Sequence, residues 1–244
     1  MNRLNKDSTL LEKCVALTSF IETGKMPLES YSGMSGNFDG QGFSFGCLQF
    51  CLGQGSLQPL LKEMIQSHSA IVDNIFGNGS ATFKEMLNKT DIQSQVAWSA
   101  AIQTNNKILP EWKDRFYKLG QTNEMQQIQL KVAKNVFDKA LAMMPIYQVK
   151  SQRAAAMFFD LRTQQGGISD TMKLDILQTF VKQNITDEVQ KLTIIAIKRA
   201  ETANPKWISD VKARRLAIVN GSGICHASNL NLEKDFFITL ENAV

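Results

Sequence analysis

Histidine is scarce in this 244-residue chain, which has only His68 and His226 beside four cysteines. Cys47 and Cys51 are spaced C-x-x-x-C, but neither histidine forms a close zinc motif with them. We therefore expect no metal and no cofactor, and interpret the four cysteines as buried free thiols of a chain folded in a reducing compartment. A cysteine peptidase using Cys47 or Cys51 is disfavoured, because His226 alone could act as its base.

Long apolar runs and basic tracts are also missing. The N-terminal MNRLNKDSTLLEK lacks the apolar core of a signal peptide, and no run is long enough to span a bilayer. We expect synthesis in the cytoplasm and no membrane insertion. The net charge is +4, which suits an anionic partner surface such as a bacterial cell wall. No Lys/Arg-rich run contains interleaved aromatics, so nucleic acid is not an expected partner.

Helical periodicity dominates the rest of the chain, and only the glycine-rich stretch 30–50 suggests a hairpin. The pattern predicts a mainly α (α+β) fold: one domain over 1–244, with helical lobes at about 1–120 and 121–244 flanking a substrate cleft. The helix at 123–143 would be about 30 Å long, enough to form the central rod of two lobes. The predicted helices cover residues 9–23, 56–68, 81–88, 91–105, 109–119, 123–143, 149–165, 170–184, 186–202 and 206–219.

The first predicted helix places an acid at its end. Glu12 can close a capping box from Ser8 or Thr9, and Gly24 ends the helix directly after Glu22 and Thr23. A second acid, Asp39, follows on the glycine-rich stretch GNFDGQGFSFGCLQF. The sequence thus places one carboxylate at the end of a predicted helix and the other on a glycine-rich turn.

Two such carboxylates are what glycosidic hydrolysis requires. One acid protonates the leaving oxygen, and a carboxylate activates water or attacks the sugar. Glu22, with Phe20 and Ile21 beside it at a helix C-terminus, suits the acid, whereas Asp39 on a polar turn suits the base. Glycines at 40, 42 and 46 would let a sugar chain approach the backbone. A solvated Glu22 and a turn-forming Asp39 remain alternatives, as does Glu29 as a partner for Glu22.

These residues resemble the lysozyme-like superfamily. SFIETG supplies its helix-end glutamate, and SFGCLQF resembles the S-x-G-x-x-Q segment of goose-type lysozymes and lytic transglycosylases. DGQGFSFGCLQFCLGQG is more similar to the D-G-R-G-Y-T-x-G-x-x-G-F segment of family-46 chitosanases. The resemblance implies that Glu22 is the general acid, Asp39 the general base, and Ser44 a hydroxyl that helps hold the water. It also implies inversion, with carboxylates about 6.5–9.5 Å apart.

The substrate is the point at which the sequence departs from the chitosanase pattern. Chitosan is polycationic, yet residues 22–60 contain only three acids. The amides of Gln41, Gln49 and Gln54 suit a neutral N-acetylated sugar, because an amide both donates and accepts hydrogen bonds. We therefore expect a muramidase acting on peptidoglycan glycan strands, with a chitosanase as the alternative. Two of these amides, Gln41 and Gln49, are candidate substrate ligands.

Two later segments extend the resemblance to bacterial and phage cell-wall hydrolases. FFDLRTQQGG, residues 158–167, resembles their cleft-lining segment, and ARRLAIVNGSGICHASNLNL, residues 213–232, resembles their closing segment. They supply the candidate substrate ligands Asp160, Gln165, Arg215 and His226. Asp160 could instead pair with Arg153 or Arg162 on its own helix, and one of the arginines at 214 and 215 could pair with an active-site carboxylate or on the surface.

Other functions stay open at this stage. A lytic transglycosylase would need the glutamate without Asp39, and a wall-binding module would need neither carboxylate. A chain without a signal peptide fits a phage endolysin released through a holin, or an effector delivered by a secretion machine. In both cases it would act in the periplasm or cell wall as a monomer, and an effector would have an immunity protein as a partner.

Overall fold

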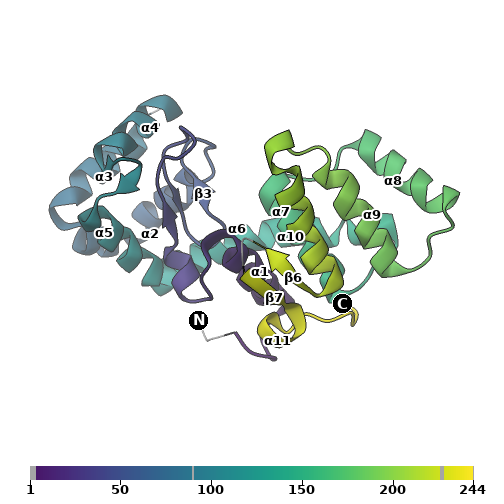
Figure 1. Cartoon of the computed structure of the whole chain (residues 1–244). Coiled ribbons are helices and arrows are strands. Elements are labelled where there is room, and N and C mark those ends of the chain that lie inside the picture. The colour runs from purple at the N-terminus through teal and green to yellow at the C-terminus, as the bar shows by residue number, and fades with distance from the viewer. Residues whose placement is uncertain (1–3, 90, 226–227, 244) are drawn as a thin grey trace. The chain divides into compact units, whose positions relative to one another are not determined.

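The computed structural model describes residues 4–89, 91–225 and 228–243 (Figure 1). Its contacts divide the chain into two compact units. The first contains Glu22–Ala133, and the second contains Leu4–Ile21 together with Lys134–Val244. The divisions fall inside two helices, α1 (Leu10–Thr23) and α6 (Asn123–Leu141). Each of these helices contributes residues to both units. The expected lobes at about 1–120 and 121–244 stay a prediction.

The first unit is built from helices and two small antiparallel sheets. Strands β1 (Met34–Ser35), β2 (Ser44–Phe45) and β3 (Phe50–Cys51) pair in that order, so that Ser44 lies opposite both Ser35 and Cys51. The other sheet is the hairpin of β4 (Gln103–Thr104) and β5 (Lys107–Ile108). The helical elements are η1 (Glu29–Ser32), α2 (Gln58–Phe76), η2 (Gly77–Gly79), α3 (Ser80–Asn88), α4 (Ile92–Ala101), α5 (Pro110–Gln121) and the first part of α6.

An aromatic cluster forms the core of this unit. Phe116 of α5 is fully buried, and its ring lies 5.1–5.7 Å from those of Phe43, Phe45, Phe76 and Phe83. Edge-to-face contacts of this kind add to the free energy gained by burying the rings. They attach the three-stranded sheet to α2, α3 and α5.

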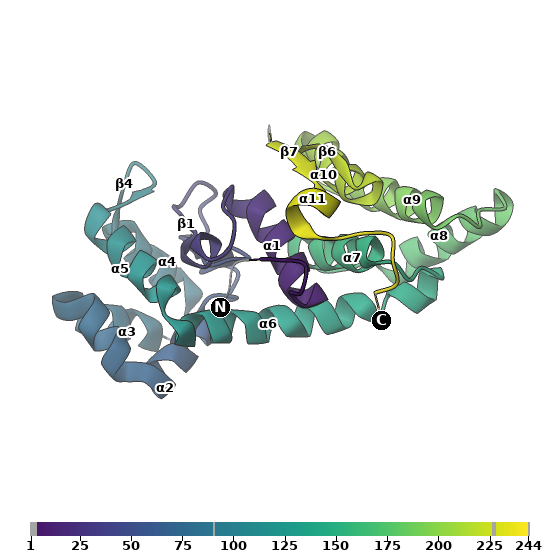
Figure 2. The ribbon, with the colours of Figure 1, turned by 90° about the horizontal axis from the view of Figure 1, so that it is seen from below.

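The second unit is almost entirely helical. Figures 1 and 2 show α8, α9 and α10 side by side, with the β6–β7 hairpin against α10. In β6–β7, Ser222 pairs with Asn231 and Gly223 with Leu230. The elements are most of α1, the end of α6, η3 (Met144–Tyr147), α7 (Gln152–Gln165), α8 (Asp170–Lys182), α9 (Glu188–Ala200), η4 (Pro205–Trp207), α10 (Ile208–Asn220), β6 (Ser222–Cys225), β7 (Ser228–Asn231) and α11 (Leu232–Phe236).

The mainly α fold is confirmed, and so is the capping box at the start of α1. The Thr9 amide donates to Glu12 Oε2 at 2.7 Å, and the Glu12 amide donates to Thr9 Oγ1 at 3.3 Å. Gly24 follows α1 with φ +69°, a conformation that glycine adopts without strain. None of the helices among the described residues is long and apolar enough to cross a membrane.

Two local predictions were wrong. Strand β4 pairs with β5 and β6 pairs with β7, both antiparallel, although only the 30–50 stretch was expected to form a hairpin. His68 does not end a helix: α2 kinks there and continues to Phe76.

The buried thiols are confirmed. All four cysteines are buried, and Cys14, Cys47 and Cys51 are free thiols. Burial raises the pKa of Cys14 and raises that of Cys47 to about 12. A thiol with that pKa is roughly one part in ten thousand thiolate at about pH 8, so it is a poor nucleophile.

We expect Cys14 and Cys47 of the folded protein to resist alkylation by iodoacetamide at about pH 8, because only the thiolate reacts. In urea all four cysteines should be labelled, which provides the control. Peptide mapping by mass spectrometry measures the labelling at each site. Fast modification of Cys47 in the folded protein would contradict the burial of this thiol and would again favour a cysteine nucleophile.

Candidate active site

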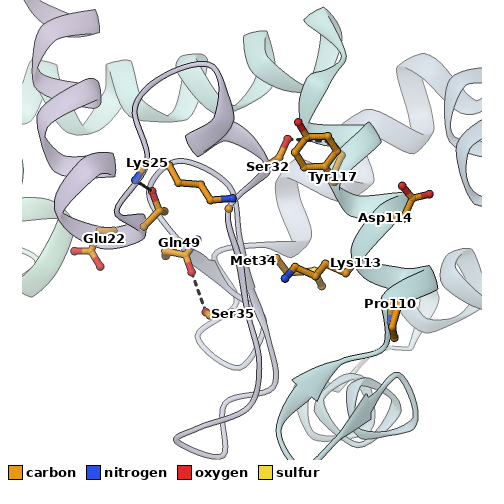
Figure 3. A pocket seen from close by; sticks show the side chains of 12 residues that line it. Glu22, Lys25, Ser32, Met34, Ser35, Gln49, Pro110, Lys113, Asp114 and Tyr117 are labelled. Carbon is orange, nitrogen blue, oxygen red and sulfur yellow. Dashed lines mark hydrogen bonds between the residues drawn. The ribbon is translucent and has the colours of Figure 1, made fainter.

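A cavity of about 550 Å³ lies in the first unit, at the end of α1. Figure 3 shows Glu22 on one side of it and Lys113 and Asp114 of α5 on the other. Two predicted site residues, Glu22 and Gln49, are brought together here. The cavity is lined by Glu22, Thr23, Lys25, Ser32, Gly33, Met34, Ser35, Gln49, Pro110, Lys113, Asp114 and Tyr117.

Glu22 is placed by the end of α1. It is half-buried in the last turn of the helix, and Gly24 turns the chain away immediately afterwards. The carboxylate is thereby held at the cavity wall by a regular helix rather than by a loop. This is the geometry that the sequence predicts for a general acid.

The Gln49 amide is held in a fixed orientation. Its Oε1 accepts from the Ser35 hydroxyl at 2.8 Å (Figure 3). Its Nε2 donates to the Gly46 carbonyl at 3.0 Å. An amide has two donor hydrogens and two acceptor lone pairs. Gln49 therefore retains one donor and one acceptor for a ligand in this cavity.

The α5 wall of the cavity was not predicted. Lys113, Asp114 and Tyr117 lie on neighbouring positions of this helix, and Asp114 forms an ion pair with Lys118 at 2.7 Å. The Tyr117 carbonyl accepts from the Ser32 hydroxyl at 2.9 Å, which attaches α5 to η1. The sequence gives the i, i+1, i+4 spacing of the three residues, but not which side of α5 faces Glu22.

Asp39, Gln41 and Ser44 are not among the residues that line the Glu22 cavity. Asp39 is exposed on the loop between β1 and β2, where its Oδ1 accepts from the Gln41 amide at 3.0 Å. This is an aspartate-stabilised turn followed by Gly40 at φ +82°. Gln41 is exposed too, and Ser44 lies in β2 between Ser35 and Cys51. The base role of Asp39, the water-holding role of Ser44 and the carboxylate separation stay predictions.

Two of the glycines do not open the backbone to a sugar, contrary to the prediction. A Cβ on Gly46 would lie 2.5 Å from Gln129 Oε1, and one on Gly42 would lie 3.1 Å from the Ser99 hydroxyl. Both are buried, with φ +90° and +85°. They are needed for close packing and for a left-handed backbone. Gly40 alone of the three has open space around its Cβ position.

Asp160 lies in the second unit and has no exposed surface. The prediction that it contacts the substrate is therefore wrong. Its partner is neither Arg153 nor Arg162. Arg214 of α10 binds it through Nη2 to Oδ1 at 2.6 Å and through Nε to Oδ2 at 3.0 Å. Thr18 of α1 donates to the same carboxylate at 3.3 Å. Asp160 therefore joins α1, α7 and α10 as a structural residue.

Arg215 is buried as well, which corrects its assignment as a candidate substrate ligand. Its Nη2 donates to the side-chain oxygens of Gln164 and Gln165. Burial lowers its pKa to about 10, so it is still a cation at neutral pH. Gln165 is half-buried, and its Oε1 already accepts the hydrogen bond from Arg215. His226, the remaining candidate, lies outside the described residues.

The fold matches that of solved chitosanases. The chain aligns with a chitosanase of Bacillus subtilis MY002 at a TM-score of 0.58 and 17% identity, covering 88% of this chain and 87% of that one. The GH46 chitosanase GsCsn46A of Gynuella sunshinyii, in complex with chitotetraose, gives 0.58 at 16%, with 88% and 86% covered. Chitosanase OU01, co-crystallised with substrate, gives 0.63 at 14%, with 94% and 99% covered.

Identities of this size show a shared fold, so the expected fold of the chitosanase type is confirmed. No model of a known protein family matches the chain, and no curated protein matches it. Among the described residues no group of three or more His, Cys, Asp and Glu side chains could hold a metal ion.

The buried Asp160–Arg214 pair generates a stability prediction. Arg214→Met or Asp160→Leu alone should lower the free energy of unfolding by about 3–5 kcal/mol, because each leaves an uncompensated buried charge. The loss of unfolding free energy in the double variant should be smaller than the sum of the losses in the two single variants, by about 2 kcal/mol or more. Urea unfolding of the four proteins measures this coupling.

An exposed pair provides the control for this cycle. Lys134 and Asp138 lie 2.6 Å apart on α6 with more than half of each side chain exposed, and their loss should have little effect on stability. Additive effects of Asp160→Leu and Arg214→Met, within about 0.5 kcal/mol, would contradict a direct buried pair.

Proposed function

We propose that this protein is a glycoside hydrolase that cleaves the β-1,4 bonds of peptidoglycan glycan strands. One observation carries the proposal: a helix-end glutamate and a fixed amide line the same cavity of about 550 Å³. The solved structures with this fold include chitosanases bound to chitotetraose or to substrate. A glycan as the binding partner is consistent with the cavity and with these ligand-bound structures.

In the proposed mechanism Glu22 protonates the glycosidic oxygen as the bond breaks. Asp39 takes a proton from the water that attacks the anomeric carbon from the opposite face, and Ser44 helps to hold that water. The product has inverted configuration, and a carboxylate separation of about 6.5–9.5 Å in the substrate complex leaves room for the water.

The charges around the cavity favour peptidoglycan over chitosan. Lys25 and Lys113 line it together with Glu22 and Asp114. Asp114 is already paired with Lys118, and Glu22 must be protonated to act as the acid. No carboxylate on this lining is then left to neutralise the amino groups of chitosan, whereas Gln49 retains donor and acceptor capacity for an N-acetyl group.

A lytic transglycosylase is the second candidate, and a specific observation favours it. Asp39 is exposed on its loop and does not line the cavity of Glu22. Transglycosylation uses a lone glutamate and forms an anhydro product without water, so it would not need Asp39. The two candidates differ in their products and in their response to loss of Asp39.

We expect wild type to release reducing-end muramic acid from purified sacculi, and both Glu22→Gln and Asp39→Asn to lose about 10²-fold or more in rate, as removal of an acid or a base does. Mass spectrometry of the digests identifies the ends. Glu29→Gln is the matched control, an exposed carboxylate of η1 that does not line the cavity, and it should keep full activity.

Three other outcomes are informative. Anhydromuramic products that survive Asp39→Asn would identify a transglycosylase. Cleavage of chitosan and not of sacculi would identify a chitosanase. Binding to sacculi without any product would identify a wall-binding module.

The place of action follows from the proposed substrate, which lies outside the cytoplasmic membrane. We propose that the protein acts in the periplasm or cell wall as a monomer, after release through a holin or delivery by a secretion machine. A protein inhibitor that occupies the Glu22 cavity is the partner expected for a delivered effector.

A further inference from the structure

A second cavity of about 580 Å³ adjoins the Glu22 cavity in the same unit. The two share four lining residues, so together they form a continuous depression along β1. We call the second cavity the lysine groove. It is lined by Met34, Ser35, Gly36, Phe38, Asn106, Lys107, Ile108, Pro110 and Lys113.

The lysine groove carries charge of one sign. Lys107 and Lys113 line it, and its lining contains no Asp or Glu. Both lysines are exposed, and within the described chain neither forms an ion pair within 4.0 Å, unlike Lys118 and Lys131 of the same unit. Two unpaired ammonium groups on one cavity attract an anionic ligand and repel a cationic one.

The walls of the lysine groove are held together by packing and hydrogen bonds. A Cβ on Gly36 would lie 1.8 Å from the Asn106 carbonyl oxygen, so the β4–β5 turn packs directly on this backbone. The Asn37 amide donates to Gln103 Oε1 at 2.8 Å, a second link between the loop and β4. Lys107 is therefore held next to β1 by the packing of its hairpin.

An exposed aromatic side chain completes the groove. Phe38 is 74% exposed, whereas Phe43, Phe45 and Phe50 of the same stretch are buried. A phenylalanine ring kept in water at a cavity wall offers a flat apolar face, which suits the apolar face of a sugar ring.

We propose that the lysine groove binds the carboxylate-bearing peptide substituent of a peptidoglycan strand. Lys107 and Lys113 contact its carboxylates, and Phe38 stacks on a neighbouring sugar. The proposal rests on the proposed function, because it names the part of that substrate bound beyond Glu22. A glucosamine polymer has no such substituent and would place cations on these lysines.

The test compares two soluble tetrasaccharides of the glycan strand, one with its peptides and one from which an amidase has removed them. Binding is measured by calorimetry on Glu22→Gln, so that neither ligand is cleaved. We expect the added double change Lys107→Gln/Lys113→Gln to weaken binding of the peptide-bearing form about five- to tenfold, and of the bare form less than twofold.

Two further variants make the result specific. Lys62→Gln/Lys89→Gln removes the same charge from exposed positions of this unit that line neither cavity, and should leave both affinities unchanged. Phe38→Ala should weaken both ligands alike, by about threefold or more, because it removes a sugar contact.

The outcomes separate this inference from the proposed function. Equal affinity of the lysine double variant and its parent for the peptide-bearing form would overturn the lysine subsite, and so would equal weakening for both ligands. Failure of wild type to cleave either tetrasaccharide would overturn the proposed hydrolase instead, since the binding measurement does not depend on cleavage.

Discussion

The helix that carries Glu22 is held by a buried ion pair. Asp160 of α7 binds Arg214 of α10 and accepts from Thr18 of α1, with all three side chains out of contact with water. Buried charges recover lost hydration only through well-aligned partners, so few alternative arrangements of these helices are tolerated. Thr18 is one helical turn before Glu22. A structural pair in the second unit thus fixes the helix whose last turn supplies the proposed acid.

Local signals in the sequence predicted the parts that local chemistry determines. The Thr9–Glu12 capping box, the end of α1 at Gly24 and most helix positions follow from residues a few places apart, and all are confirmed. The partner of Asp160 could not be found in this way, because Arg214 is 54 positions distant and only the packing of α7 on α10 brings them together. The β4–β5 hairpin was missed since its strands are two residues long, although Asn105 and Asn106 with φ of 51° and 59° are typical hairpin-turn residues.

The candidate site was predictable to a similar extent. Glu22 and Gln49, two candidates from the sequence, line one cavity, and their roles stay predictions. The loop glycines that suggested an open path for a sugar mostly serve packing, as Gly46 does against Gln129. Lys107 and Lys113 carry no motif, and their common position on one groove depends on how α5 and a hairpin pack against β1. The proposed preference for peptidoglycan over chitosan therefore rests on the charges that the fold assembles, since Lys107 and Lys113 line the groove without a carboxylate.

In the proposed mechanism two carboxylates, Glu22 and Asp39, direct water onto the anomeric carbon. Proton NMR of the sugar released first from a soluble β-1,4-linked strand tests this most directly, before the anomers equilibrate. We expect the α anomer as the initial product, because a single displacement by water inverts the anomeric carbon. An initial β anomer, or a 1,6-anhydro end with no free anomeric hydroxyl, would contradict it.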